Sequence, residues 1–239
     1  MVDATSTEKE PGAVSTFKEV LLQSAFSRGR AISDSISEIE LGIFANEGRE
    51  LVSLMMRDPR RREFGKLVYV TNERKVLLQD KPTAGDENSV SHSVKMNILI
   101  DNTSLPWYLR QDRMIAASLH SHPEDISPSS EDLQQLLLGD FDYSASSVVF
   151  VSSAKRNFVI FRGKNTPQFT REQVYEKIAL WERSIKERVI EFTIPYMSNS
   201  AQMETNNKAR LALLRQAGKK YDLKIFVGEA DSTRVSLLL

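Results

Sequence analysis

Residues 113–132 have the sequence RMIAASLHSHPEDISPSSED, which combines an apolar run, two histidines and the start of a helix. The apolar run before the histidines is typical of a buried strand that reaches the surface at its end. Successive side chains of a strand alternate between its two faces, so we expect His120 and His122 on one face. After a loop with two prolines, residues 129–138 have the pattern of a capped helix with Asp132 in its first turn.

Two histidines and one aspartate form a set of metal ligands if the strand and the helix bring them together. The chain has no cysteine, so any metal must be held by nitrogen and oxygen atoms. Three protein ligands leave the fourth position of a tetrahedral zinc ion for water, which distinguishes catalytic zinc sites from closed structural ones. The alternative is that the histidines are neighbours by coincidence and that Ser129 to Asp132 is only a capping box.

The segment from His120 to Asp132 resembles the signature of the JAMM metalloprotease family, also called the MPN-plus domain. That signature is a distant Glu, then His-x-His-Pro, then Pro/Leu-Ser-x-x-Asp, and the resemblance covers about residues 46–192. It implies an MPN-like (cytidine-deaminase-like) fold, with a mixed sheet flanked by helices. It also implies zinc ligands at His120, His122 and Asp132, with Ser129 assisting an oxyanion. The connection between the second histidine and the aspartate is one residue shorter than usual in the family, which leaves the serine after Ser129 as an alternative.

The family's catalytic base is a glutamate upstream of the histidines, and Glu63 has the matching position. It stands directly before a glycine-containing apolar stretch, although Gly65 falls one place earlier than in the commoner Glu-x-x-Gly version. The alternative is that Glu63 is an exposed charge beside the arginines at 60–62. Competing glutamates with a poorer local context are Glu38, Glu40, Glu47, Glu50 and Glu73.

The rest of the chain alternates between strand and helix patterns, which indicates an α/β fold. The expected elements are a helix over 46–57, a hairpin over 63–70 and 75–78, a strand over 94–100, a hairpin over 147–152 and 157–162, a long helix over 174–192, and a helix and a strand over 206–221 and 223–227.

Three regions are expected along the chain. Residues 1–45 form an N-terminal tail and a poorly assigned segment, in which 1–15 are mobile, and residues 46–195 form a JAMM/MPN-like catalytic domain. Residues 196–239 form an additional helix-strand extension, which begins with a polar linker over 196–204.

The composition excludes several classes of protein. The chain has 239 residues, and its 32 basic and 32 acidic residues balance to a net charge of zero. This balance makes nucleic-acid binding unlikely, because binding that is independent of sequence needs a broad positive field. The chain start lacks a signal-peptide pattern and no apolar run is long enough to span a membrane, so we expect a cytoplasmic protein.

The resemblance implies a zinc metallopeptidase, a deubiquitinase-like isopeptidase that hydrolyses a peptide or isopeptide bond after a ubiquitin-like protein. Glu63 would act as the general base, and the loops over 81–91 and 101–112 would select the substrate. One alternative is a catalytically silent MPN-type scaffold that binds a protein partner, or a second copy of itself, through the C-terminal extension. Another is a zinc hydrolase that acts on a small amide or on a substrate linked to nucleic acid, of which the neutral net charge disfavours the second.

Overall fold

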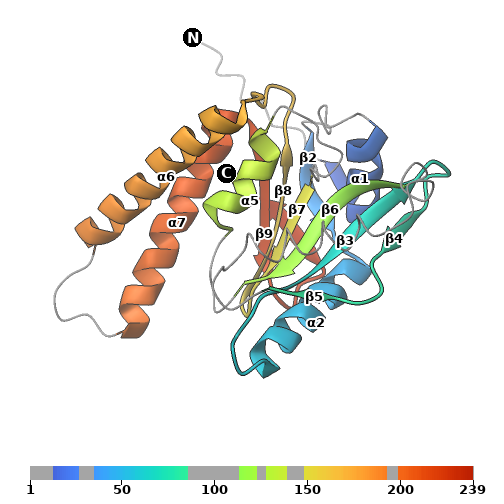
Figure 1. Cartoon of the computed structure of the whole chain (residues 1–239), viewed down its shortest axis with the longest axis horizontal. Coiled ribbons are helices and arrows are strands. Elements are labelled where there is room, and N and C mark those ends of the chain that lie inside the picture. The colour runs from blue at the N-terminus through green and yellow to red at the C-terminus, as the bar shows by residue number, and fades with distance from the viewer. Residues whose placement is uncertain are drawn as a thin grey trace, which may run out of the picture.

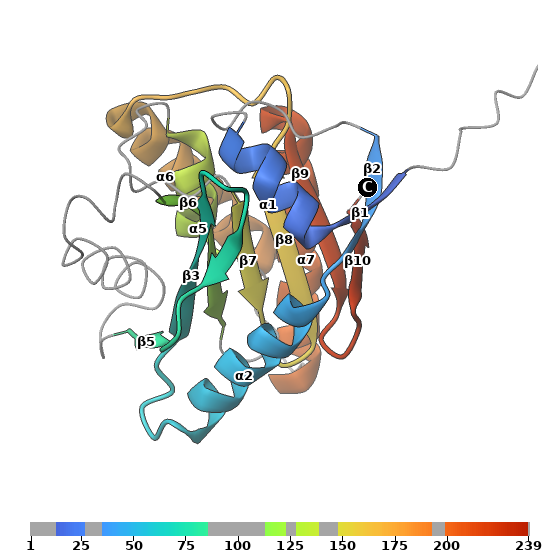
Figure 2. The ribbon, with the colours of Figure 1, turned by 90° about the vertical axis from the view of Figure 1, so that its right-hand side faces the viewer.

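The computed structural model of the protein describes residues 13–26, 35–85, 113–122, 128–138, 148–192 and 199–238. In these ranges the chain forms one mixed sheet with helices on both faces (Figures 1 and 2). The elements are β1 (Ala13–Thr16), α1 (Phe17–Phe26), β2 (Ile36–Glu40), α2 (Ile43–Arg57), β3 (Phe64–Thr71), β4 (Val76–Leu78), β5 (Thr83–Ala84), β6 (Arg113–Ser121), α5 (Ser130–Leu137), β7 (Val148–Ser152), β8 (Arg156–Arg162), α6 (Arg171–Phe192), α7 (Asn199–Tyr221), β9 (Leu223–Glu229) and β10 (Arg234–Leu237).

The strands follow the order β1-β2-β10-β9-β8-β7-β6-β3-β4, and β5 also pairs with β3. The pairs β1–β2 and β6–β7 are parallel, whereas β3 and β6 are antiparallel. A parallel pair needs a crossover connection, and α5 lies in the connection between β6 and β7. The expected α/β class, with a mixed sheet flanked by helices, is therefore confirmed.

Each face of the sheet has its own apolar core, because strand side chains alternate between the two faces. The first core joins α1 and α2 to one face; its members include Phe17, Leu21, Leu51, Phe150 and Phe161. The second joins α5, α6 and α7 to the other face; its members include Leu136, Val149, Ile160, Val174 and Leu214. In Figure 1 the paired helices α6 and α7 extend beyond the sheet on one side.

Most of the strands and helices expected from the sequence are confirmed, with ends that differ by a few residues. Two segments expected to lack regular structure were assigned wrongly: 13–15 belong to β1, and 199–204 form the first turns of α7. β1 is only four residues long and directly follows Pro11 and Gly12, and its hydrogen bonds come from β2, which is distant from it in the sequence. α7 opens with the polar residues Asn199 and Ser200, and the helix formers Ala, Gln, Met and Glu follow at 201–204. The strand expected over 94–100 lies outside the described residues.

The C-terminal helix and strand are part of the main sheet. β9 pairs with β8 along its whole length, from Arg156↔Glu229 to Arg162↔Leu223, and β10 links β9 to β2. Residues 199–238 therefore share the sheet and the cores of the rest of the described chain. None of the described helices has the length and apolar character needed to cross a membrane.

The helix α2 approaches β7 closely at Gly48. A Cβ atom on Gly48 would lie 2.8 Å from Cε1 of Phe150 and 2.8 Å from Oγ of Ser152. The backbone carbonyl of Ser152 in turn accepts a hydrogen bond from the amide of His122, at 2.8 Å. The absence of a side chain at this glycine thus helps to place the end of β6.

We expect Gly48→Val to lower the free energy of unfolding by about 2 kcal/mol, because overpacking a filled core costs about 1–3 kcal/mol. Unfolding in urea measures the change. Asn46→Val, on the exposed side of the same helix, is the matched control for the helix propensity of valine. Equal stability of the two variants would contradict the close approach at Gly48.

Candidate metal centre

The end of β6 and the first turn of α5 bring three buried side chains together. His120 and His122 lie two residues apart along β6 and its end, so they point to the same face. Asp132 is the third helical residue of α5. Their exposed fractions are 0%, 2% and 0%. The sequence prediction that these residues meet is confirmed.

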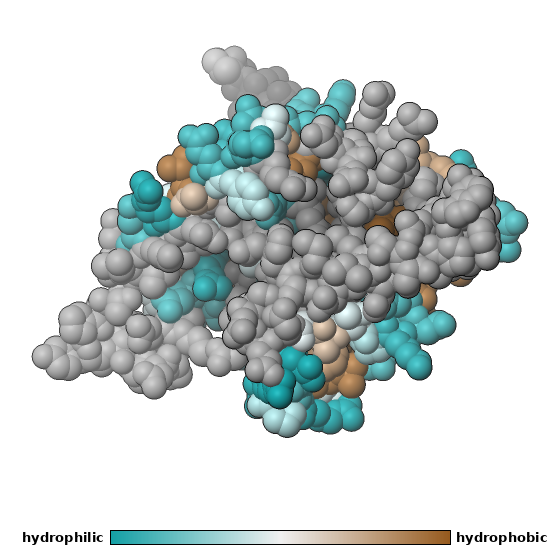
Figure 3. All heavy atoms as spheres, viewed as in Figure 1, coloured by the Kyte–Doolittle hydropathy of each residue, from teal (hydrophilic) through white to brown (hydrophobic). Residues whose placement is uncertain are grey.

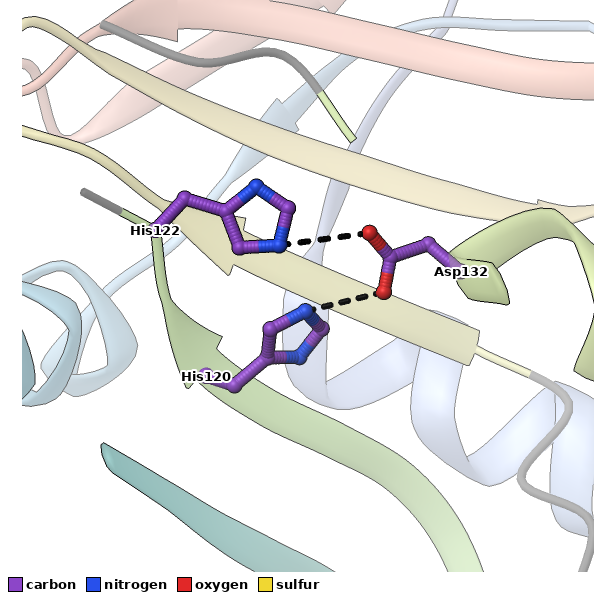
Figure 4. A group of neighbouring side chains, drawn as sticks. All are labelled: His120, His122 and Asp132. Carbon is purple, nitrogen blue, oxygen red and sulfur yellow. Dashed lines mark ion pairs between the residues drawn. The ribbon is translucent and has the colours of Figure 1, made fainter. Parts of the chain in front are cut away.

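The imidazole nitrogens of both histidines face the Asp132 carboxylate (Figure 4). Nε2 of His120 lies 2.9 Å from Oδ1 of Asp132, and Nε2 of His122 lies 3.3 Å from Oδ2. The potential ligand atoms of the three residues all lie within 4.8 Å of one another. These distances are close to the ~3.3 Å separation of two ligands on one tetrahedral zinc ion, so the three residues form a candidate metal site.

The chemistry of this donor set fits a divalent transition metal. Burying a carboxylate away from water is costly unless positive charge compensates it. Imidazole nitrogen suits zinc, copper, iron and nickel, whereas magnesium and calcium prefer oxygen. Two imidazoles and one carboxylate are also among the ligand sets of catalytic zinc.

Ser129 is the N-cap of α5, and it also holds Asp132. The Asp132 amide donates to Ser129 Oγ at 3.3 Å, while Oδ2 of Asp132 accepts from the Ser129 amide at 2.6 Å and from its hydroxyl at 2.9 Å. The expected capping box is therefore present, and it does not exclude the metal site. Asp132 lies in the first turn of α5, where its amide and its Oδ2 atom take part in the cap. Its carboxylate also faces the two histidines.

Glu63 lies directly before β3, and its side chain points towards the histidines. Its Oε1 atom is 3.8 Å from Nε2 of His122, and the residue is 3% exposed. The alternative that Glu63 is an exposed charge beside the arginines is thus wrong. Among the competing glutamates, ion pairs tie Glu47 and Glu50 to Lys66, Glu38 and Glu40 to Arg234, and Glu73 to Lys75.

Ser121, between the two histidines, fixes the position of the strand that follows Glu63. It is fully buried, and its hydroxyl accepts a hydrogen bond from the Phe64 amide at 2.9 Å and donates to the Phe64 carbonyl at 3.3 Å. The Glu63 carbonyl accepts a further hydrogen bond from the Gly85 amide, at 2.8 Å. Ser121 was not predicted as a functional residue from the sequence. A small polar residue between the two histidines, on the opposite face of the strand, was the feature that could have indicated it.

No protein-family model matches this chain, and a comparison with curated proteins finds no match. Membership of the JAMM family and the MPN-like identity of the fold therefore stay predictions. The case for a function must come from the geometry of the site.

We expect the purified protein to bind about one divalent metal ion per chain, and His122→Ala and Asp132→Asn to lose it, because each change removes one of three ligands. Elemental mass spectrometry of the folded proteins measures the metal content. His92→Ala is the matched control, since it removes the third histidine of the chain, and it should keep the metal. A wild-type protein that stays metal-free in the presence of added zinc would rule out the site.

Ser121→Ala should leave the metal content unchanged while it lowers the free energy of unfolding by about 1–3 kcal/mol, the cost of a buried backbone group that loses its partner. Exchange of the Phe64 amide hydrogen, followed by NMR, should become faster. Ser53→Ala, at a half-buried position of α2 where the hydroxyl accepts a hydrogen bond from the Arg57 side chain, controls for loss of a hydroxyl. Unchanged protection of the Phe64 amide would show that the Ser121 hydroxyl does not hold this strand.

Proposed function

We propose that the protein is a zinc-dependent peptidase that hydrolyses a peptide or isopeptide bond. One observation carries the proposal: a buried carboxylate, Glu63, lies 3.8 Å from an imidazole of a buried His-His-Asp group. Three such ligands leave a coordination position open, and a carboxylate beside that position is the arrangement that general-base hydrolysis needs. The resemblance to the JAMM family in sequence supports the same conclusion.

His120, His122 and Asp132 would hold the zinc ion. Zinc supplies Lewis acidity, which promotes ionisation of water and polarises a carbonyl group. The role of Glu63 is to accept the proton of the attacking water and to pass it to the leaving amine.

Ser129 has two proposed tasks. The first, holding Asp132, rests on the hydrogen bonds of the capping box. The second, donating a hydrogen bond to the oxyanion, is the role that the family resemblance implies. This second task requires the hydroxyl hydrogen to turn from Oδ2 of Asp132 towards the substrate.

The proposed substrate is the C-terminal tail of a ubiquitin-like protein or its conjugate, as the family resemblance implies. An extended tail binds most simply by adding a strand to an exposed sheet edge. β5 pairs with β3 at Phe64 and Gly65, beside Glu63, so among the described strands it is the one next to the site at which such a tail could add. The loops expected to select the substrate fall mainly on residues outside the described ranges.

Glu63→Gln should retain the metal but lower kcat at least about 100-fold, because loss of a general base typically costs 10²–10⁴-fold. Initial rates on a panel of ubiquitin-like fusions and small amides measure the change, and elemental mass spectrometry verifies the metal. Glu73→Gln is the matched control, since its exposed carboxylate pairs with Lys75. Full activity of the Glu63 variant would remove it as the base; metal binding without hydrolysis of any panel member by the wild type would favour the scaffold alternative.

A further inference from the structure

Four arginines gather in the turn between α2 and β3, next to the proposed base. The segment 57–62 has the sequence RDPRRR, and we call Arg57, Arg60, Arg61 and Arg62 the basic lip. Four arginines and one aspartate give this segment a net charge of +3, in a chain whose total is zero. The positive charge is therefore a local feature.

The turn is ordered by the aspartate within it. Asp58, of which 4% of the side chain is exposed, accepts hydrogen bonds from the Arg60 amide at 2.9 Å and from Nε of Arg62 at 2.6 Å. The Arg61 amide donates to the Asp58 carbonyl at 2.9 Å. The Arg60 amide, together with the hydrogen bond and charge of Arg62, holds the pKa of Asp58 below its usual value. The arginines are thus presented by a preformed turn.

Arg61 has a backbone conformation that glycine would adopt more easily. Its φ is 53°, in the left-handed region, where a residue other than glycine costs of order 1 kcal/mol or more. Arg57, Arg60 and Arg61 are nonetheless exposed to solvent. Arg61 thus combines an unfavourable backbone conformation with an exposed, positively charged side chain.

The basic lip lies at the end of the sheet that holds the metal centre. β3 begins at Phe64 and runs antiparallel to β6, with Gly65 opposite His120. Figure 1 shows the connection from α2 rising to the start of β3 beside the end of β6. Arg60 precedes Glu63 by three residues, so their Cα atoms are at most about 11 Å apart. A chain bound at the site would pass within reach of these guanidinium groups.

We propose that the basic lip binds an acidic segment of the polypeptide substrate, adjacent to the bond that is cleaved. This inference rests on the proposed peptidase function. Guanidinium groups pair with carboxylates in a defined planar geometry, and a cluster of like charge also speeds the encounter with an oppositely charged partner. Glu47 and Glu50 of the neighbouring α2 are engaged with Lys66, so these acidic side chains have another cation as partner.

A polypeptide is favoured over a nucleic acid as the partner. Nucleic-acid binding that is independent of sequence uses a basic surface that follows several phosphates, whereas the lip is one turn of a chain without excess positive charge. The proposed chemistry at the adjacent site also acts on an amide bond. A short run of Asp or Glu beside that bond matches the extent of the lip.

The test uses the full chain with Glu63→Gln, which prevents turnover, and two fluorescein-labelled eight-residue peptides. One alternates Glu and Gly, and the other alternates Gln and Gly. We expect the acidic peptide to bind at least about ten-fold more tightly in fluorescence anisotropy, and its affinity to fall with added salt. Arg60→Gln with Arg61→Gln should weaken its binding about four- to twenty-five-fold, since each exposed ion pair contributes a factor of about two to five.

Lys164→Gln with Lys219→Gln is the matched control, because it removes two exposed charges near the start of β9, at the opposite end of the sheet. Equal binding of the two peptides, an equal loss in this control, or tighter binding of an oligothymidine than of the acidic peptide would overturn the proposal. Metal content and hydrolysis are measured separately from peptide binding. Selective binding of the acidic peptide by a protein that holds no metal would contradict the peptidase function but would still support the basic lip as a binding surface for acidic peptides.

Discussion

The buried carboxylate of Asp132 connects two elements that a loop separates in the sequence. Its Oδ1 atom faces the imidazole of His120, whereas its Oδ2 atom faces the imidazole of His122 and also accepts hydrogen bonds from Ser129 at the start of α5. A carboxylate in a dry interior is destabilising unless its charge is compensated. A cation held at the candidate metal centre would therefore link the packing of α5 against the sheet to the site.

The second constraint is the register between β3 and β6. Gly65 pairs with His120, and a slip of one residue would turn every side chain of β3 to the other face. The hydrogen bonds from Ser121 to both backbone groups of Phe64 hold this register at its functional end. Glu63 consequently faces the histidines, although it lies 57 residues before His120 in the sequence. The hydroxyl between the two histidines thus positions the proposed base through the backbone of Phe64.

The local parts of this arrangement could be predicted from the sequence, and the long-range parts could not. The apolar run of β6, the capping pattern at Ser129 and the apolar spacing in α6 depend on neighbouring residues, so local patterns predicted them. β9 is different: its place beside β8 depends on the pairing of residues such as Ile160 and Ile225, which lie 65 positions apart and share no local pattern. β1 was missed because it is short and its partner β2 is distant in the sequence, and the start of α7 was missed because its first residues are as polar as a loop. Glu63 was predicted from the resemblance to the JAMM family and from its position before a glycine-containing apolar stretch, whereas Ser121 was missed because its partner is backbone.

Exposed arginines and a buried glutamate lie only a few residues apart in the turn before β3. Asp58 neutralises part of the basic lip and sets the path of the chain over three residues, after which Glu63 enters the interior. A base for hydrolysis benefits from a site shielded from water, because charges interact more strongly there. Under the proposed function, a substrate would be recruited from solvent, where exposed charges act over distance. This segment would serve both needs, since Arg57, Arg60 and Arg61 are exposed while Glu63 is buried beside His122.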